Sequence, residues 1–246
     1  MERFTSFDGT GIAYITDGPN DGPDVLLLHG FAADHRLNWV APGVVDALAS
    51  AGHHVIALDA RGHGQSDKPR DPSAYQSDAM PRDAQALLDH LGVETVDVVG
   101  YSMGSMVSSR LVPMEPRTRR LVLGGVGQGL VTGRMPRAGV ADGLIADDPS
   151  TITDPTARAF RRFADSTGAD RHALWAIQKG RGGQGPPIGD IRVPTLVLVG
   201  RDDVLVGPPE PLAAAIPGAV VQIVEGDHLS AVADPAFSKA IVDFLS

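Results

Sequence analysis

The sequence predicts an α/β fold, an open and mostly parallel sheet of eight strands flanked by helices. Short apolar runs recur along the chain, amphipathic helical patterns separate them, and a hairpin signal precedes them. Most runs are continuous rather than alternating, which is typical of strands buried on both faces of a parallel sheet. Strands that alternate with helices build such a sheet through successive crossovers. The length of 246 residues suffices for a full hydrophobic core.

The chain begins with two expected strands that form a hairpin. Arg3–Phe7 and Ile12–Thr16 flank Asp8-Gly9-Thr10-Gly11, a turn signal. The remaining strands are expected at Val25–Leu28, Val55–Leu58, Val96–Val99, Leu121–Leu123, Thr195–Val199 and Val220–Val224. Two hairpin strands and six buried runs account for the eight.

Helical patterns lie between these strands. Apolar residues from Met80 to Leu91 recur with helical spacing, and Gly92 is expected to end that helix. Pro209 to Ile216 is expected to form a short helix. Asp234-Pro235 begins the last helix, because proline is favoured in the first helical turn.

One long segment, 127–189, interrupts the alternation of strands and helices. It contains no strand-like run, and Asp154-Pro155 opens a helical pattern within it. A weaker helical pattern covers Arg171–Lys179. An insertion of this length is usually functional, so the sequence predicts a helical cap, 127–189, on a core formed by 1–126 and 190–246.

The composition excludes several classes of site and partner. Cysteine is absent, which rules out disulfides, thiolate metal sites and a cysteine nucleophile. The formal net charge of −9 disfavours nucleic acids and anionic membranes as partners. Neither a long apolar span nor a signal-peptide core is evident, so a cytoplasmic protein that acts on a small molecule is expected. The oligomeric state is left open.

A nucleophile motif follows one of the expected strands. Val96–Val99 leads into Gly100-Tyr101-Ser102-Met103-Gly104, a G-x-S-x-G sequence, and a helical stretch follows. In this strand–turn–helix context the sharp turn exposes the Ser102 hydroxyl above the sheet. Gly100 and Gly104 remove Cβ atoms where strand and helix approach each other. The pattern therefore favours Ser102 as a nucleophile over a simple helix cap.

With these motifs the whole chain resembles the α/β-hydrolase superfamily. Leu26–Phe31 resembles its strand and oxyanion loop, and Asp59–Ser66 resembles its D-x-R-G-x-G-x-S turn. Val193–Asp203 resembles the strand that carries the acid, and Gly226–His228 resembles the loop that carries the base. The resemblance implies an eight-stranded hydrolase core with a catalytic triad.

The base and the acid follow the chain order of this fold, which is Ser, then acid, then His. Two histidines, His172 and His228, follow the nucleophile, and His172 lies in the inserted segment. His228 follows the last strand, at the sheet edge where catalytic loops gather, and is predicted as the base. The family's G-x-x-D spacing from Gly200 selects Asp203 rather than its neighbour Asp202 as the acid.

The oxyanion hole requires two backbone N–H donors. Met103, the residue after the nucleophile, is expected to supply one of them. Phe31 supplies the other by resemblance, because it follows His-Gly in the oxyanion loop. The expected substrate pocket, mostly apolar as such pockets are, is lined by Tyr101, Phe160, Phe163, Trp175, Leu205 and Leu229.

No metal site or cofactor is expected. The spacing of the histidines does not suggest metal ligands, and the triad mechanism needs no cofactor. Asp59, Arg61 and His63 could form a second site, but a structural turn is favoured.

The predicted function is a serine hydrolase that cleaves a small or medium, largely uncharged ester or lactone through an acyl-enzyme. A carbon–carbon bond (dienoate) hydrolase and a cofactor-free perhydrolase reuse the same triad and stay open. A non-catalytic ligand-binding relative is the alternative from another class. An epoxide hydrolase or dehalogenase of this fold is expected to have Asp where this chain has Ser102.

Overall fold

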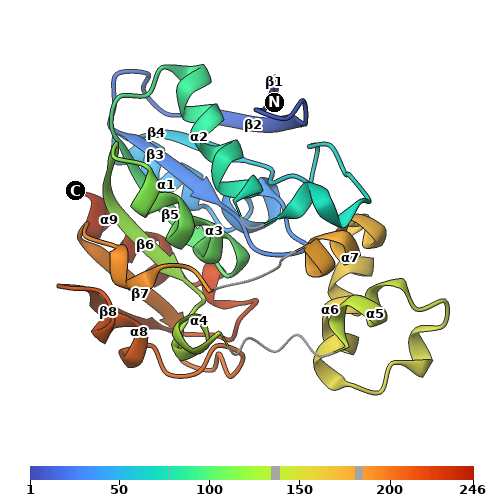
Figure 1. The fold of residues 1–246 in the computed structure, drawn as a ribbon. Helices are drawn as coiled ribbons and strands as arrows, with labels where there is room; N and C mark the ends of the chain where they lie inside the picture. Colours follow the sequence, from blue (N-terminus) through green and yellow to red (C-terminus); the bar gives the residue numbers. More distant parts are fainter. Residues whose placement is uncertain (77, 134–138, 181–184) are drawn as a thin grey trace.

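The computed structural model describes residues 1–76, 78–133, 139–180 and 185–246. Its centre is an eight-stranded sheet with the order β1-β2-β4-β3-β5-β6-β7-β8 (Figure 1). The pairs β1–β2 and β2–β4 are antiparallel, and every other pair is parallel. The strands are β1 (Glu2–Thr5), β2 (Gly11–Asp17), β3 (Asp24–Leu28), β4 (His54–Leu58), β5 (Val96–Tyr101), β6 (Thr118–Gly124), β7 (Thr195–Gly200) and β8 (Val220–Val224). The predicted mostly parallel, eight-stranded sheet is confirmed.

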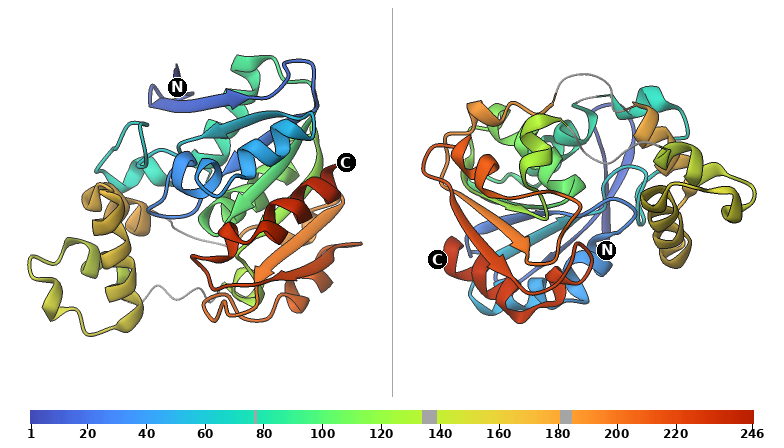
Figure 2. Two further views of the ribbon diagram at one scale, coloured as in Figure 1. Left: turned by 180° about the vertical axis from the view of Figure 1, so that it is seen from behind. Right: turned by 90° about the horizontal axis from the view of Figure 1, so that it is seen from below.

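Helices cover both faces of this sheet (Figure 2). On β3, Val25 and Leu27 pack with α1 and α9, whereas Leu26 and Leu28 pack with α2 and α3 on the opposite face. Both faces of the strand are therefore buried, which explains its continuous apolar sequence. The core helices are α1 (Val44–Ser50), α2 (Ala79–Leu91), α3 (Met103–Leu111), α8 (Glu210–Ala214) and α9 (Pro235–Leu245).

Helix ends lie close to where the sequence predicts them. Gly92 ends α2 with a positive φ of 68°, a conformation that glycine adopts without strain. The Asp234 carboxylate accepts the Ala236 N–H at the start of α9. The predicted helix over Pro209 to Ile216 is shorter in the structure, since α8 covers only Glu210–Ala214. No helix among the described ranges is long and apolar enough to cross a membrane.

The inserted segment contains α4 (Gln128–Thr132), α5 (Val140–Ile145), α6 (Pro155–Thr167) and α7 (Arg171–Gly180). The helices α5, α6 and α7 form a lobe beyond one end of the sheet (Figure 1). In contrast, α4 is hydrogen-bonded to the core, because Gln128 N–H donates to Pro208 O and Gly129 N–H donates to Val206 O. The predicted start of a helix at Asp154-Pro155 is confirmed, and the Asp154 carboxylate accepts the Ala157 N–H at the beginning of α6.

Candidate active site

The turn predicted as a nucleophile elbow places Ser102 at the carboxyl end of β5. Its backbone has φ 51° and ψ −106°, a conformation that costs a non-glycine residue about 1–3 kcal/mol. Its N–H donates to Gly124 O at 2.8 Å, which ties the elbow to β6. A Cβ on Gly104 would lie 1.8 Å from Leu28 O, and one on Gly100 would lie 2.5 Å from Gly104 O. Only glycine at both positions lets α3 approach the sheet this closely.

A chain of hydrogen bonds connects the three residues predicted as the triad. His228 Nε2 lies 2.9 Å from Ser102 Oγ, and His228 Nδ1 lies 2.7 Å from Asp203 Oδ2. The Asp203 side chain is fully buried and can only accept when ionised. The imidazole therefore carries its proton on Nδ1, and Nε2 is left to accept the serine proton. Asp202, the rejected neighbour, is exposed.

Two loops bring Asp203 and His228, the predicted acid and base, together. After β7, Arg201 N–H donates to Val224 O at 2.8 Å and Asp202 N–H donates to Gly226 O at 3.0 Å. These bonds join the loop that carries Asp203 to the loop that carries His228. Tyr101 supports the loop that carries His228, because its hydroxyl donates to His228 O at 2.8 Å. Burial raises the pKa of Tyr101 far above its ordinary value, so this donor keeps its proton.

The loop after β3 is held by a neutral histidine. Burial lowers the pKa of His29, and the ring makes two hydrogen bonds. Nδ1 donates to Gly30 O at 2.8 Å, and Nε2 accepts the Ala60 N–H at 3.0 Å. His29 thus supports the loop rather than acting as a base. Phe31 follows in the same loop and lies at the cavity beside Ser102.

Met103 is the first residue of α3. Its N–H belongs to the first helical turn, where backbone donors have no partner within the helix. The positive end of the helix dipole points toward the same place. Met103 and Phe31 therefore lie where the sequence predicts the two oxyanion donors, and their role is part of the function proposed below.

A cavity of about 120 Å³ opens above Ser102 and is mostly apolar. Four of the predicted pocket residues line it, namely Tyr101, Phe160, Phe163 and Leu229. Phe160 and Phe163 come from α6, so the inserted segment contributes one wall. Phe160 also contacts the Phe31 ring edge to face, with the ring centroids 5.8 Å apart.

Trp175 and Leu205 do not line this cavity, so the prediction for these two residues is wrong. Trp175 lies on α7 and packs, partly buried, against the main core. Leu205 is also packed on that core, and its backbone N–H donates to Asp203 Oδ1 at 3.1 Å.

Sequence reasoning missed several residues that line the cavity. They are Gly30, Ala33, Leu37, Asn38 and Val232. Three of them belong to the segment after His29-Gly30, which returns to the site through a single π-helical turn, Arg36–Val40. Such a turn has no apolar periodicity by which it could be found.

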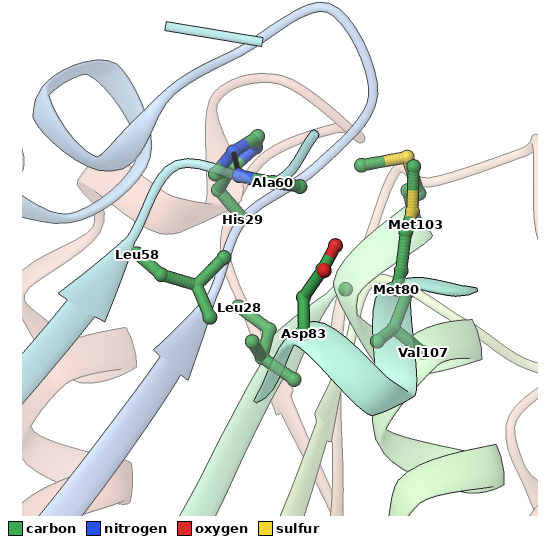
Figure 3. Close-up of a pocket in the computed structure, with 9 residues that line it drawn as sticks. Leu28, His29, Leu58, Ala60, Met80, Asp83, Met103 and Val107 are labelled. Carbon is green, nitrogen blue, oxygen red and sulfur yellow. Dashed lines mark hydrogen bonds between the residues drawn. The ribbon is translucent and has the colours of Figure 1, made fainter. Parts of the chain in front are cut away.

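A second cavity lies beside His29, with walls from β3, β4, α2 and α3 (Figure 3). Its volume is about 10 Å³, room for about one water molecule. His29, Asp83 and Met103 are among the residues that line it. This cavity is too small for a substrate, so the candidate substrate site is the cavity that Ser102 and His228 line.

The turn after β4 is a structural unit. Asp59 Oδ1 accepts the His35 N–H at 2.9 Å and its ring Nδ1–H at 2.8 Å, and Oδ2 accepts the Gln65 N–H at 2.8 Å. Burial opposes ionisation of Asp59, but these hydrogen bonds outweigh it and hold its pKa well below the ordinary value. A Cβ on Gly64 would lie 2.1 Å from Asp59 Oδ2, so the turn closes tightly on the carboxylate.

Arg61, in the same turn, is fully buried. Its Nε and Nη2 donate to the two oxygens of Asp83 at 2.7 and 2.6 Å, and Nη1 donates to Asp8 at 2.8 Å. This guanidinium is engaged by carboxylates and is not presented to the cavity. Across the described residues, no group of three or more His, Asp or Glu is arranged to hold a metal ion.

Comparison with known proteins identifies the family. The family described as "alpha/beta hydrolase fold" matches residues 23–175. The chain belongs to this family. A solved hydrolase from Pseudomonas aeruginosa PA01 superposes on this α/β hydrolase with a TM-score of 0.79 and 28% identity, covering 100% of this chain and 98% of the other. An enol-lactonase from Burkholderia xenovorans LB400 superposes with a TM-score of 0.75 and 25% sequence identity, covering 99% of both chains.

Relatives of known sequence are also hydrolases. "Epoxide hydrolase B" of Mycobacterium tuberculosis is 36% identical over 118 residues, 47% of this α/β hydrolase and 32% of the relative. The chain thus spans about a third of the length of the first relatives it matches. A 2-hydroxy-6-oxononadienedioate/2-hydroxy-6-oxononatrienedioate hydrolase from Paraburkholderia xenovorans is 30% identical over 228 residues, covering 82% of this chain and 78% of the relative.

Proposed function

We propose that this α/β hydrolase is a serine hydrolase that cleaves a small or medium, largely uncharged carboxylic ester or lactone. The observation that carries the proposal is the continuous hydrogen-bond chain from Ser102 through His228 to Asp203 at the floor of an apolar cavity. The esterases and the enol-lactonase among its structural neighbours support the same reaction class.

Acylation begins when the Ser102 hydroxyl attacks the carbonyl carbon. His228 Nε2, at 2.9 Å, takes the serine proton. Asp203 stabilises the imidazolium that forms, through its bond to Nδ1–H. The N–H groups of Phe31 and Met103 stabilise the oxyanion. His228 then gives the proton to the leaving alkoxide, and the carbon–oxygen bond breaks to leave an acyl-enzyme.

Deacylation reverses the proton path with water in place of the alcohol. His228 takes a proton from water as the water oxygen attacks the acyl carbon. The second oxyanion collapses, Ser102 leaves with the proton from His228, and a carboxylic acid is released. The proposed steps use water and the side chains and backbone N–H groups already described, and no cofactor enters them.

The cavity favours an uncharged substrate. Among the described residues that line it, none is Lys or Arg, and the net charge of the protein is −9. A dianionic substrate such as the dienedioate in the name of the Paraburkholderia relative needs cationic partners when it leaves water. Of the ester, lactone and carbon–carbon alternatives, we therefore favour an uncharged ester or lactone.

We further propose that the insertion, 127–189, acts as a cap that roofs the substrate. Phe160 and Phe163 on α6 contribute apolar side chains to the cavity. The lobe formed by α5, α6 and α7 lies beyond the end of the sheet (Figure 1), and the hydrogen bonds of α4 anchor its start to the core.

Covalent labelling tests the proposal. A fluorophosphonate should react with the wild-type protein, and peptide mass spectrometry should locate the adduct on Ser102. Ser102→Ala should abolish labelling and ester turnover. Ser105→Ala is the matched control, because the Ser105 hydroxyl donates to Gly124 O rather than to a histidine. An adduct elsewhere, or turnover by Ser102→Ala, would overturn the assignment.

A substrate panel tests the reaction class. Nitrophenyl esters and lactones should be hydrolysed, and dienoates should not. Faster cleavage of a dienoate than of any ester would instead support a carbon–carbon bond hydrolase. Peroxide-dependent peracid formation that outpaces hydrolysis would support a perhydrolase, and the absence of any turnover would support a ligand-binding relative.

A further inference from the structure

The side chain of Phe31 lies between the core and the inserted segment. Its ring packs edge to face with the His63 ring, with the ring centroids 5.9 Å apart, and with the Phe160 ring at 5.8 Å. His63 belongs to the turn after β4, whereas Phe160 belongs to α6 of the insertion. Phe31 is only 7% exposed. The residue whose backbone N–H is a proposed oxyanion donor is thus also the one whose side chain contacts α6.

The loop around Phe31 has a conformation that its surroundings must maintain. The next residue, Ala32, has a φ of 60°, in the left-handed region that is unfavourable for a residue with a Cβ. Such conformations persist where surrounding contacts determine them. The Gly30 N–H donates to Asn38 Oδ1 at 2.8 Å, and the Gly30 carbonyl accepts the Ala33 N–H at 3.3 Å. These bonds hold the loop before and after Phe31, and the packing of its ring adds to them.

The insertion also rests on the turn that supports this loop. A Cβ on Gly62 would lie 2.8 Å from Ile177 Cδ1 of α7, so α7 packs closely on the turn after β4. The Ala60 N–H of the same turn donates to His29 Nε2 at 3.0 Å. The insertion therefore meets the loop after β3 directly through Phe160 and indirectly through this turn.

We propose that Phe160 is a positioning residue that acts through the ring of Phe31, so that the insertion sets an oxyanion donor as well as a wall of the cavity. The inference rests on the proposed serine-hydrolase function, in which the Phe31 N–H stabilises the oxyanion. Phe160 holds the Phe31 ring, and the ring holds the backbone that carries this N–H. Because the donor acts on charge that develops in the transition state, loss of Phe160 should slow acylation more than it weakens substrate binding.

Single-turnover acylation tests this inference. Release of p-nitrophenol from p-nitrophenyl acetate and p-nitrophenyl hexanoate gives the acylation rate constant separately from the substrate dissociation constant. Phe160→Ala should slow acylation about fivefold, the rate equivalent of one aromatic pair. Since the effect passes through the loop and not through the acyl chain, the factor should be the same for both esters. Labelling at Ser102 should still reach completion, because the nucleophile is unchanged.

Phe163→Ala is the matched control. Phe163 lines the same cavity from the same helix. As a wall residue it contributes by burying apolar parts of the substrate, and that contribution grows with the apolar area buried. Phe163→Ala should therefore affect the hexanoate more than the acetate, whereas Phe160→Ala should not distinguish them in the acylation step.

A double-mutant cycle tests whether Phe160 acts through Phe31. Phe31→Leu removes the ring but keeps the backbone N–H. In that variant Phe160→Ala should slow acylation further by less than about twofold, whereas Phe163→Ala should keep its full effect on the hexanoate. Phe160→Leu loses the ring contact but keeps apolar volume, and it takes the place of Phe160→Ala if the thermal midpoint shows that the alanine variant is not folded.

The outcomes are distinct. If Phe160→Ala slows the hexanoate more than the acetate, or keeps its full effect in the Phe31→Leu variant, Phe160 only lines the cavity and the inference fails. A change in acylation below about twofold for both esters also overturns it, while leaving the serine-hydrolase proposal intact. A wild-type protein that hydrolyses neither ester and is not labelled at Ser102 refutes the underlying function instead.

Discussion

Replacing Asp203 by Asn should nearly abolish turnover, because the new amide would hold His228 in the wrong tautomer. Asp203 Oδ2 lies 2.7 Å from His228 Nδ1, and Oδ1 accepts the Leu205 N–H at 3.1 Å. A carboxylate accepts at both places, whereas an amide has a single acceptor atom. Since the Leu205 N–H can only donate, the amide oxygen turns toward it and the NH₂ group donates to His228 Nδ1.

That arrangement moves the imidazole proton to Nε2. Nε2 then faces Ser102 Oγ as a donor and cannot take the serine proton. The opposite orientation of the amide sets its NH₂ against the Leu205 N–H, which leaves two buried donors without an acceptor. We therefore expect kcat/KM of Asp203→Asn to fall by about 10⁴, which corresponds to about 5 kcal/mol of transition-state stabilisation.

The assay is hydrolysis of p-nitrophenyl butyrate, with the thermal midpoint measured to show that the variant is folded. Asp202→Asn is the matched control, because Asp202 is exposed and substitutions at exposed sites change free energies by about 0.5 kcal/mol or less. Its kcat/KM should stay within about twofold of the wild type. If Asp203→Asn keeps more than about a tenth of the activity, a barrier change below about 1.4 kcal/mol, the tautomer argument is refuted.

Three further predictions follow from the packing. Gly104→Ala should lower the free energy of unfolding, measured with urea, by about 4 kcal/mol or more, because its Cβ would lie 1.8 Å from Leu28 O. Gly189→Ala is the control and should leave the stability unchanged, because its Cβ would meet nothing within 4 Å. Folding lowers the pKa of Asp59, so the ionised carboxylate stabilises the folded protein at pH values above the ordinary aspartate pKa of about 4, and this stabilisation is lost as the pH falls below that value. Asp59→Asn should therefore lower the free energy of unfolding by about 2 kcal/mol at pH 7 and make it less dependent on acidic pH. Replacing 139–180 by a short linker should change the ranking of esters but not labelling by a small fluorophosphonate, and an unchanged ranking would show that the cap does not select the substrate.

The central strands could be predicted because their apolar sequences reflect burial on both faces, whereas β8 is apolar although most of its residues are not buried. β3 is apolar at every position from Val25 to Leu28 since both faces are covered, and helix boundaries follow local chemistry such as Gly92 and Asp234. The choice of Asp203 over Asp202 depended on family resemblance, because two adjacent carboxylates differ in the direction they point and not in composition.

The walls of the cavity were harder to predict. Whether a large apolar side chain faces the core or the substrate depends on how the inserted helices pack. Phe160, Phe163 and Trp175 all pack against the main core, but of these three only the two phenylalanines also line the cavity. Asn38 carries no signal of its own, because its environment is set by the Gly30 N–H eight residues earlier in the chain.

The family match covers only some of the residues on which the proposed chemistry depends. The match over 23–175 includes Ser102 and Phe31 but ends before β7 and β8, which carry Asp203 and His228. The hydrogen bonds that join these loops are therefore independent of the match. An epoxide hydrolase of this fold is expected to have Asp at position 102, where attack on an epoxide gives an alkyl ester, whereas a serine attacks a carbonyl to give an acyl ester. Sequence identity that covers about a third of an epoxide hydrolase is therefore weaker evidence for the reaction type than the single residue at position 102.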